Sequence, residues 1–207
     1  MWIISTKEIP VHSRSFPVSI EFLRPIVTPP MAELNKTYKE SLADIKAFLF
    51  DVDGVFSTGQ VLLLPNADPV RTFHSRDTYA LQHALKEGLR IIIITGGHSD
   101  GVTEYFNRFG VTEFHDRVSN KVDKLEELIA TTGLEAAHCA YMGDDIPDLR
   151  VMQRVGFPCC PNDAAEEVKA VSLFVSHAKG GHGCVRDLLE QAMKVQGKWM
   201  TEKAHTW

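Results

Sequence analysis

Two aspartates separated by a single residue follow an apolar segment of the chain. Asp51 and Asp53 come directly after residues 46–50, which predict a short buried strand, and Gly54 follows at once. Open α/β sheets bind their ligands at the carboxyl ends of their strands. Two carboxylates this close repel each other unless a cation or a proton lies between them. The pair is a candidate catalytic or metal-binding site, although an exposed acidic turn fits a lone motif of this kind equally well.

A second acidic pair follows a later strand. Residues 139–142 are apolar and are followed by Gly143, then by Asp144 and Asp145, with Asp148 one helical turn further on. Acidic side chains favour the first turn of a helix, so a capping role for Asp145 is the alternative explanation. Two consecutive aspartates directly after a buried strand and a glycine are harder to explain by capping alone. They add oxygen ligands to the candidate site.

Two further segments carry groups that suit an anion. The apolar run 91–94 is followed by Thr95 and Gly96, which offer a hydroxyl and a flexible backbone, although a plain strand-to-helix turn has the same composition. Lys121 opens a predicted helix, where a positive charge opposes the helix dipole, and an anionic partner would compensate it. A solvated surface lysine would need no such partner.

The elements that position these residues alternate along the chain. Strands are predicted at residues 46–50, 91–94, 111–115, 139–142, 157–160 and 173–175. Amphipathic helical patterns lie between them, and most end just before a glycine. Repeated strand–helix units predict an α/β fold with a mainly parallel sheet and helices on both faces.

One segment interrupts this alternation. Residues 60–64 and 70–74 are strand-like and flank the segment 65–69, which contains two prolines, an asparagine and an aspartate. They predict a small β-hairpin flap directly after the first strand. It could cover the crevice or contact another subunit, and a plain surface hairpin is the alternative.

Composition excludes several classes of protein. With 207 residues, 44% hydrophobic and 24% charged, the chain resembles an ordinary water-soluble domain. A net charge of −5 argues against nucleic-acid binding, and no apolar run approaches the ~18 residues of a membrane span. The four cysteines lack metal-site spacing, and Cys159 and Cys160 lie in an apolar segment, which indicates buried thiols in a reducing compartment.

The ends of the chain differ from its centre. Residues 1–30 are rich in proline and predict a weakly ordered extension without a secretory signal. Met31 is an alternative start, followed by a predicted first helix at 32–42. Residues 31–200 are expected to form a single domain, and residues 201–207 a C-terminal tail.

Taken in order, the motifs around Asp51, Thr95, Lys121 and Asp144 resemble those of the haloacid dehalogenase superfamily of phosphatases. Four segments narrow the resemblance to the cap-less 3-deoxy-D-manno-octulosonate 8-phosphate phosphatases: residues 73–77, 143–148, 180–187 and 196–198. The resemblance implies a Rossmann-like three-layer α/β/α fold without a cap domain. It also implies a cytoplasmic enzyme of lipopolysaccharide biosynthesis, and a homotetramer in which the hairpin and C-terminal tail of neighbouring subunits help to close the site.

The resemblance also assigns roles to the acidic residues. Asp51 would be the nucleophile that forms an aspartyl-phosphate intermediate, and Asp53 the general acid and base. Mg²⁺ would be held by the Asp51 carboxylate, the Asp53 backbone carbonyl and Asp144. Asp145 and Asp148 would orient these ligands or hold the lysine.

The remaining roles concern the substrate. Thr95 and the Gly96 N–H would contact a phosphoryl oxygen, and Lys121 would neutralise the nucleophile and the developing charge. Arg76 and Arg186 are candidates for binding the carboxylate of the sugar or a neighbouring subunit. For each arginine, a structural ion pair is an equally good interpretation.

The chain departs from the family pattern at four positions around the expected substrate: Thr58, Thr78, Gly97 and Cys184. These departures leave the reaction intact and put the sugar in doubt. A phosphatase for a nine-carbon 2-keto-3-deoxy acid 9-phosphate is the nearest alternative.

Two other classes of protein share parts of the pattern. A receiver domain of two-component signalling also combines acidic residues, Thr, Lys and Mg²⁺, but its phosphorylated aspartate follows a later strand. A non-catalytic module resembling the tail of a sugar-nucleotide synthetase is the second alternative. The complete set of chemical motifs argues against it.

Overall fold

Six parallel strands form one sheet in the computed structural model, which describes residues 37–65 and 68–206. The spatial order of the strands is β3-β2-β1-β4-β5-β6. Their bounds are β1 Ala47–Phe50, β2 Arg90–Ile94, β3 Glu113–His115, β4 Cys139–Met142, β5 Phe157–Cys160 and β6 Phe174–Val175. The expected α/β class with a parallel sheet is confirmed, and the described residues contain no cap domain.

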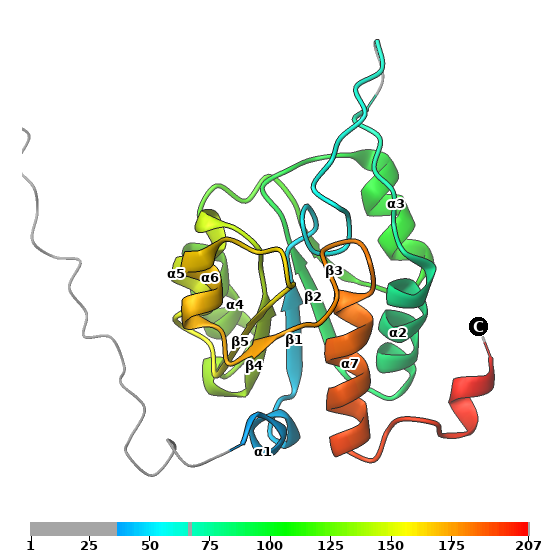
Figure 1. The fold of residues 1–207 in the computed structure, drawn as a ribbon, viewed down its shortest axis with the longest axis vertical. Coiled ribbons are helices and arrows are strands. Elements are labelled where there is room, and N and C mark those ends of the chain that lie inside the picture. Colours follow the sequence, from blue (N-terminus) through cyan, green and yellow to red (C-terminus); the bar gives the residue numbers. More distant parts are fainter. Residues whose placement is uncertain (1–36, 66–67, 207) are drawn as a thin grey trace, which may run out of the picture.

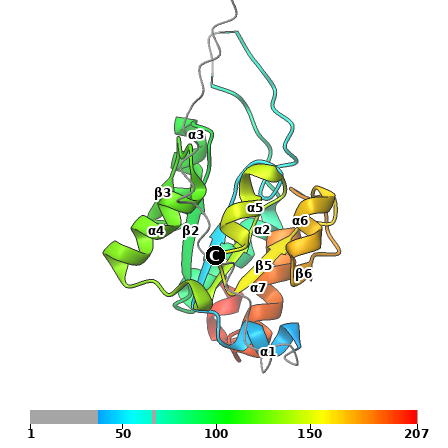
Figure 2. The ribbon, with the colours of Figure 1, turned by 90° about the vertical axis from the view of Figure 1, so that its left-hand side faces the viewer.

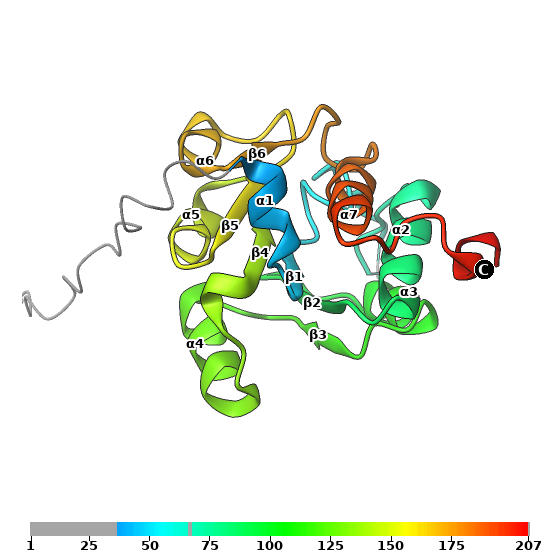
Figure 3. The ribbon, with the colours of Figure 1, turned by 90° about the horizontal axis from the view of Figure 1, so that it is seen from below.

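Helices cover both faces of this sheet (Figure 3). Their bounds are α1 Tyr38–Ala43, α2 Ser75–Lys86, α3 Asp100–Arg108, α4 Lys121–Thr132, α5 Ile146–Met152, α6 Glu166–Val171 and α7 Cys184–Val195. Successive side chains of a strand point to opposite faces. In β1, Phe48 and Phe50 therefore pack with α2, α3 and α7, whereas Ala47 and Leu49 pack with α4, α5 and α6. All four cysteines are buried and free, as expected.

Successive strands are added first on one side of β1 and then on the other. The chain runs from β1 to β2 and β3 on one side, and continues with β4, β5 and β6 on the other. The connections after β1 and β4 therefore diverge, and α/β sheets place their ligand crevice at such a point. Asp51 follows β1 and Asp144 lies two residues beyond β4, so the topology brings both to this edge of the sheet.

The hairpin after β1 is more open than the sequence predicts. A single antiparallel bridge joins Leu62 and Val70, and residues 60–64 and 70–74 form no regular strands. Pro65 and Pro69 cannot donate to a ladder, and no strand among the described residues pairs with either arm. Figures 1 and 2 show these two segments, the arms of the hairpin, extending beyond the sheet. Residues 66 and 67, at the expected turn, lie outside the described residues.

The expected extension at residues 1–30, the alternative start at Met31 and the beginning of the helix predicted at 32–42 lie outside the described residues. The helix that is described, α1, is capped by Thr37 and Glu40. At the other end, a short 3₁₀ helix at Glu202–His205 packs on α2 of the same chain (Figure 1), where the Tyr79 hydroxyl donates to the Ala204 carbonyl at 2.6 Å. None of the described helices is long and apolar enough to cross a bilayer.

Candidate active site

Asp51 and Lys121 form a buried ion pair at the switch in strand order. Asp51 lies one residue past β1, where its N–H donates to the Met142 carbonyl of the neighbouring β4. The Lys121 ammonium lies 3.1 Å from Asp51 Oδ1, and its side chain is 7% exposed. Lys121 is the first residue of α4, whose free N–H groups are capped by the Asn120 side chain. The lysine thus points its charge at the sheet edge and away from solvent.

Asp148 completes the environment of the lysine. Its Oδ1 accepts from Lys121 Nζ at 2.6 Å and from the Tyr141 hydroxyl at 2.7 Å, and its Oδ2 accepts from the Asp144 N–H at 3.2 Å. The carboxylate can fold back against the strand end because residue 143 is glycine, where a Cβ would lie 2.4 Å from Asp148 Cβ. Both oxygens of Asp148 are therefore engaged inside the protein.

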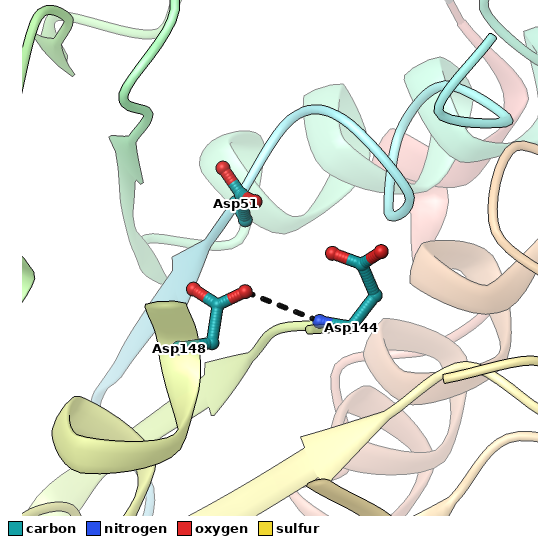
Figure 4. Close-up of side chains that lie close together, drawn as sticks. All are labelled: Asp51, Asp144 and Asp148. Carbon is teal, nitrogen blue, oxygen red and sulfur yellow. Dashed lines mark hydrogen bonds between the residues drawn. The ribbon is translucent and has the colours of Figure 1, made fainter. Parts of the chain in front are cut away.

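A third carboxylate, that of Asp144, lies close to those of Asp51 and Asp148 (Figure 4). Each of Asp51, Asp144 and Asp148 offers an oxygen, and these three oxygens lie within 4.8 Å of one another. Gly54 makes room for Asp144: its φ of +86° favours glycine, and a Cβ there would lie 1.9 Å from an Asp144 carboxylate oxygen. The chain thus builds an oxygen-rich cluster that suits a hard divalent cation.

The electrostatics of this cluster support a cation. Burial raises the pKa of Asp51 to about 6, with Lys121 opposing the shift and Asp148 adding to it. Burial and the charges of Asp51 and Asp148 raise the pKa of Asp144 to about 7. Burial alone would lower the pKa of Lys121, but the carboxylates of Asp51 and Asp148 raise it. One ammonium therefore faces three carboxylates, and a divalent cation would balance the remaining negative charge.

Asp53 lies in a different environment from Asp51. Its Oδ1 accepts from Arg71 Nε at 2.7 Å and from the Ser57 hydroxyl at 3.0 Å, and its Oδ2 accepts from Arg71 Nη2 at 2.9 Å. Its side chain is about one-third exposed, whereas that of Arg71 is nearly buried. The two aspartates of the motif therefore have separate cationic partners from separate parts of the chain.

Thr95 and Gly96 follow the next strand of the sheet. The Thr95 N–H donates to the His115 carbonyl of β3, and its buried hydroxyl accepts from the Gly97 N–H at 3.2 Å. Gly96 is exposed at the same edge. Because β2 pairs directly with β1, this hydroxyl lies at the edge that also carries Asp51.

Other predicted site residues lie apart from the carboxylate cluster. Asp145 is exposed at the start of α5 and makes no capping hydrogen bond. Arg186 pairs with Glu190 at 2.6 Å and stacks on the Trp199 ring. Arg76 is exposed and lines a cavity with Arg186 and three histidines, and this lining includes none of the clustered aspartates.

Sequence reasoning missed three residues that hold the acidic groups in place: Arg71, Tyr141 and Ser57. Tyr141 lies within an apolar strand, and the position of its hydroxyl depends on how α5 packs. Ser57 lies four residues after Asp53, a spacing that fits a local side-chain contact. Nothing in the sequence separates Arg71 from an ordinary hairpin arginine.

The raised carboxyl pKa values predict an unusual pH dependence of stability for the metal-free protein. Between the ordinary pKa of 3.8 and about 7 the folded state holds a proton on Asp144 that the unfolded state has released. Unfolding free energy should therefore fall as pH rises through this range. After allowance for partial exposure, the free energy of unfolding of Asp144→Asn should exceed that of the wild type by about 1–3 kcal/mol at pH 8. The difference should be much smaller at pH 5.

Urea unfolding in the presence of a chelator measures this difference. Adding Mg²⁺ should stabilise the wild type at pH 8 and have less effect on Asp144→Asn. If the unfolding free energies of the two proteins depended equally on pH, the raised pKa of Asp144 would be contradicted.

Comparison with known proteins agrees with this geometry. A family model of haloacid dehalogenase-like hydrolases matches residues 103–186. The 3-deoxy-D-manno-octulosonate 8-phosphate phosphatase of Salmonella typhi is 30% identical over 155 residues, which are 75% of this chain and 82% of that protein. The crystal structure of the Yersinia pestis phosphatase of the same name has a TM-score of 0.75 at 29% identity, covering 77% of this chain and 86% of that one.

A third relative carries ligands. The crystal structure of the Moraxella catarrhalis 3-deoxy-D-manno-octulosonate 8-phosphate phosphatase, in complex with magnesium ion, phosphate ion and KDO, has a TM-score of 0.75 at 31% identity. It covers 82% of this chain and 95% of that one. Sequence and structure agree over most of each protein, and the chain belongs to the cap-less 3-deoxy-D-manno-octulosonate 8-phosphate phosphatase family of haloacid dehalogenase-like hydrolases, which are phosphatases of phosphoric monoesters.

Proposed function

We propose that this chain hydrolyses 3-deoxy-D-manno-octulosonate 8-phosphate to KDO and phosphate through an aspartyl-phosphate on Asp51. The observation that carries the proposal is the environment of Asp51: a buried carboxylate at the switch in strand order, 3.1 Å from the Lys121 ammonium and close to Asp144. A nucleophilic carboxylate needs nearby positive charge to accept a phosphate dianion. The names of the relatives supply the substrate.

The residues present fit Mg²⁺, the ion named for the Moraxella relative. Asp51 and Asp144 would hold it, with the Asp53 backbone carbonyl as the third protein ligand. Asp148 is less suited to direct ligation because both of its oxygens already accept hydrogen bonds. When bound, the ion neutralises phosphoryl charge beside the carboxylates.

The reaction proceeds in two displacements at phosphorus. An Asp51 oxygen forms a bond to phosphorus while the bond from phosphorus to the sugar oxygen breaks, and Asp53 gives its proton to that oxygen. Water then attacks phosphorus, its proton passes to Asp53, and the electron pair of the breaking bond returns to Asp51. Lys121 stabilises negative charge during both steps, and Thr95 and Gly96 bind a phosphoryl oxygen.

The eight-carbon sugar is favoured over the nine-carbon one by the names of the relatives. Gly97, one of the departures from the family pattern, lies against Asp53 and Arg71 and therefore beside the reacting groups. Parallel measurement of kcat/KM on the two sugar acid phosphates would decide between the substrates. The octulosonate substrate would place the enzyme in the cytoplasm, in the synthesis of a lipopolysaccharide sugar.

Asp51→Asn should reduce phosphatase activity by at least about 1000-fold while leaving the fold intact, because an amide cannot act as the nucleophile. The matched control is Asp123→Asn, which removes an exposed carboxylate from the first turn of α4 and should change the rate little. Steady-state kinetics and circular dichroism measure both properties. Substantial residual turnover in Asp51→Asn would refute the assignment.

Chemical trapping tests the intermediate separately. Borohydride reduction of the enzyme during turnover should convert Asp51 to homoserine, which peptide mass spectrometry detects. Unmodified Asp51 under conditions of steady turnover would contradict a covalent intermediate.

We also infer that the chain associates with copies of itself through the hairpin arms, in a homotetramer. The arms expose four consecutive apolar side chains, Val61 to Leu64, and Leu63 is 75% exposed. Apolar runs of this kind on an open hairpin are typical of contact surfaces.

The double substitution Leu62→Lys, Leu63→Glu should lower the solution mass from about four chains to one or two, because charges would be desolvated at the contact. Light scattering coupled to size-exclusion chromatography measures the mass. Leu173→Glu, at another exposed leucine, is the control and should leave the mass unchanged. An unchanged mass in the double variant would exclude the arms as the interface.

A further inference from the structure

The contact between Arg71 and Asp53 joins the hairpin to the proposed acid/base residue. Arg71 directly follows Val70, which forms the only bridge between the described parts of the two arms. Its guanidinium reaches both oxygens of Asp53, and Nη1 also donates to the Pro69 carbonyl at 3.3 Å. Its side chain is only 8% exposed, so the arginine is enclosed at this contact.

The hydrogen bonds distinguish the two oxygens of Asp53. Oδ1 accepts from Arg71 Nε and from the Ser57 hydroxyl, whereas Oδ2 accepts only from Arg71 Nη2 among the described residues. A carboxylate oxygen has two lone pairs. Oδ1 is therefore fully engaged, and Oδ2 keeps one lone pair for a proton.

Oδ2 lies on the side of the phosphate-binding residues. A Cβ placed on Gly97 would be 3.6 Å from Asp53 Oδ2, 3.6 Å from Thr95 Oγ1 and 3.3 Å from Arg71 Nη2. The glycine at this position leaves room for the guanidinium beside Oδ2. A small cavity bounded by Asp53, Arg71, Thr95 and Gly97 opens at the same place.

We propose that Arg71 is a positioning residue of the reaction: with Ser57 it fixes Oδ1 and aims Oδ2 of Asp53 at the oxygen that leaves phosphorus. The inference rests on the proposed function and deepens it. In the first displacement the proton on Oδ2 passes to the ester oxygen as its bond to phosphorus breaks, and the alcohol departs. In the second, the attacking water returns a proton to Oδ2. A fork of two N–H groups fixes a carboxylate in a way that a lysine cannot.

Leaving-group dependence distinguishes this role from a structural one. The ratio kcat/KM reports steps up to the first irreversible one, in which the alcohol departs. A primary alkyl phosphate needs its leaving oxygen protonated, whereas p-nitrophenyl phosphate releases a stable anion and needs little help. If Oδ2 of Asp53 is no longer held toward the leaving oxygen, kcat/KM should therefore fall for the alkyl ester and change little for the p-nitrophenyl ester.

Arg71→Met should lower kcat/KM for a primary alkyl phosphate by about 10- to 100-fold and for p-nitrophenyl phosphate by less than about threefold. Arg71→Lys should recover only part of the loss, since it keeps the charge without the fork. The matched control is Arg90→Met, which removes a similar two-bond contact with Glu113 at the opposite edge of the sheet and should leave the ratio of the two rates unchanged.

The outcomes separate the inference from the proposed function. Equal losses on both esters, or no loss on either, would overturn the positioning role while leaving the phosphatase assignment standing. Full recovery in Arg71→Lys would show that charge alone suffices and would also overturn it. The proposed substrate, 3-deoxy-D-manno-octulosonate 8-phosphate, is the primary alkyl phosphate to use, and failure of the wild-type protein to hydrolyse it would refute the proposed function itself.

Discussion

The ammonium of Lys121 lies between the carboxylates of Asp51 and Asp148, and the rest of the site depends on this interaction. An enclosed lysine without partners would be strongly destabilising, as would the aspartates without the lysine. Because the three groups come from the end of β1 and the starts of α4 and α5, the ion pairs hold together segments far apart in sequence. The same contacts orient Asp51, so the site and the local fold share one set of interactions.

The topology of the sheet explains why the carboxylates of the site can lie so close together. The reversal of strand order beside β1 leaves an opening between the connections that follow β1 and β4. Glycines at 54 and 143 then allow carboxylates to approach backbone where any side chain would collide with them. Burial and mutual repulsion raise the pKa values of Asp51 and Asp144, and this stored repulsion is what a divalent cation relieves on binding.

Sequence patterns predicted those features that depend on position along the chain. Asp51 and Asp144 follow buried strands, and parallel strands bring their carboxyl ends to a common edge, so their meeting was foreseeable. Arg71 reaches Asp53 only because the second arm of the hairpin returns past the end of β1, and no periodic pattern in the local sequence indicates this. The environment of Arg186 also depends on tertiary structure, because Trp199 stacks on it from beyond the last long helix. The hairpin is more open than predicted because no strand in the described part of the chain pairs with its arms.

The two aspartates of the motif, although separated by one residue, are controlled from different parts of the molecule. Asp51 is buried and paired with a lysine from α4, which suits its proposed role as a nucleophile that must keep one orientation. Asp53 is more exposed and is held by an arginine from the hairpin, which also carries the exposed leucines. A partner that covers those leucines would therefore contact the segment that holds the proposed acid/base group. Under the proposed roles, subunit contact and proton transfer depend on the same short segment of chain, and the hairpin takes part in both.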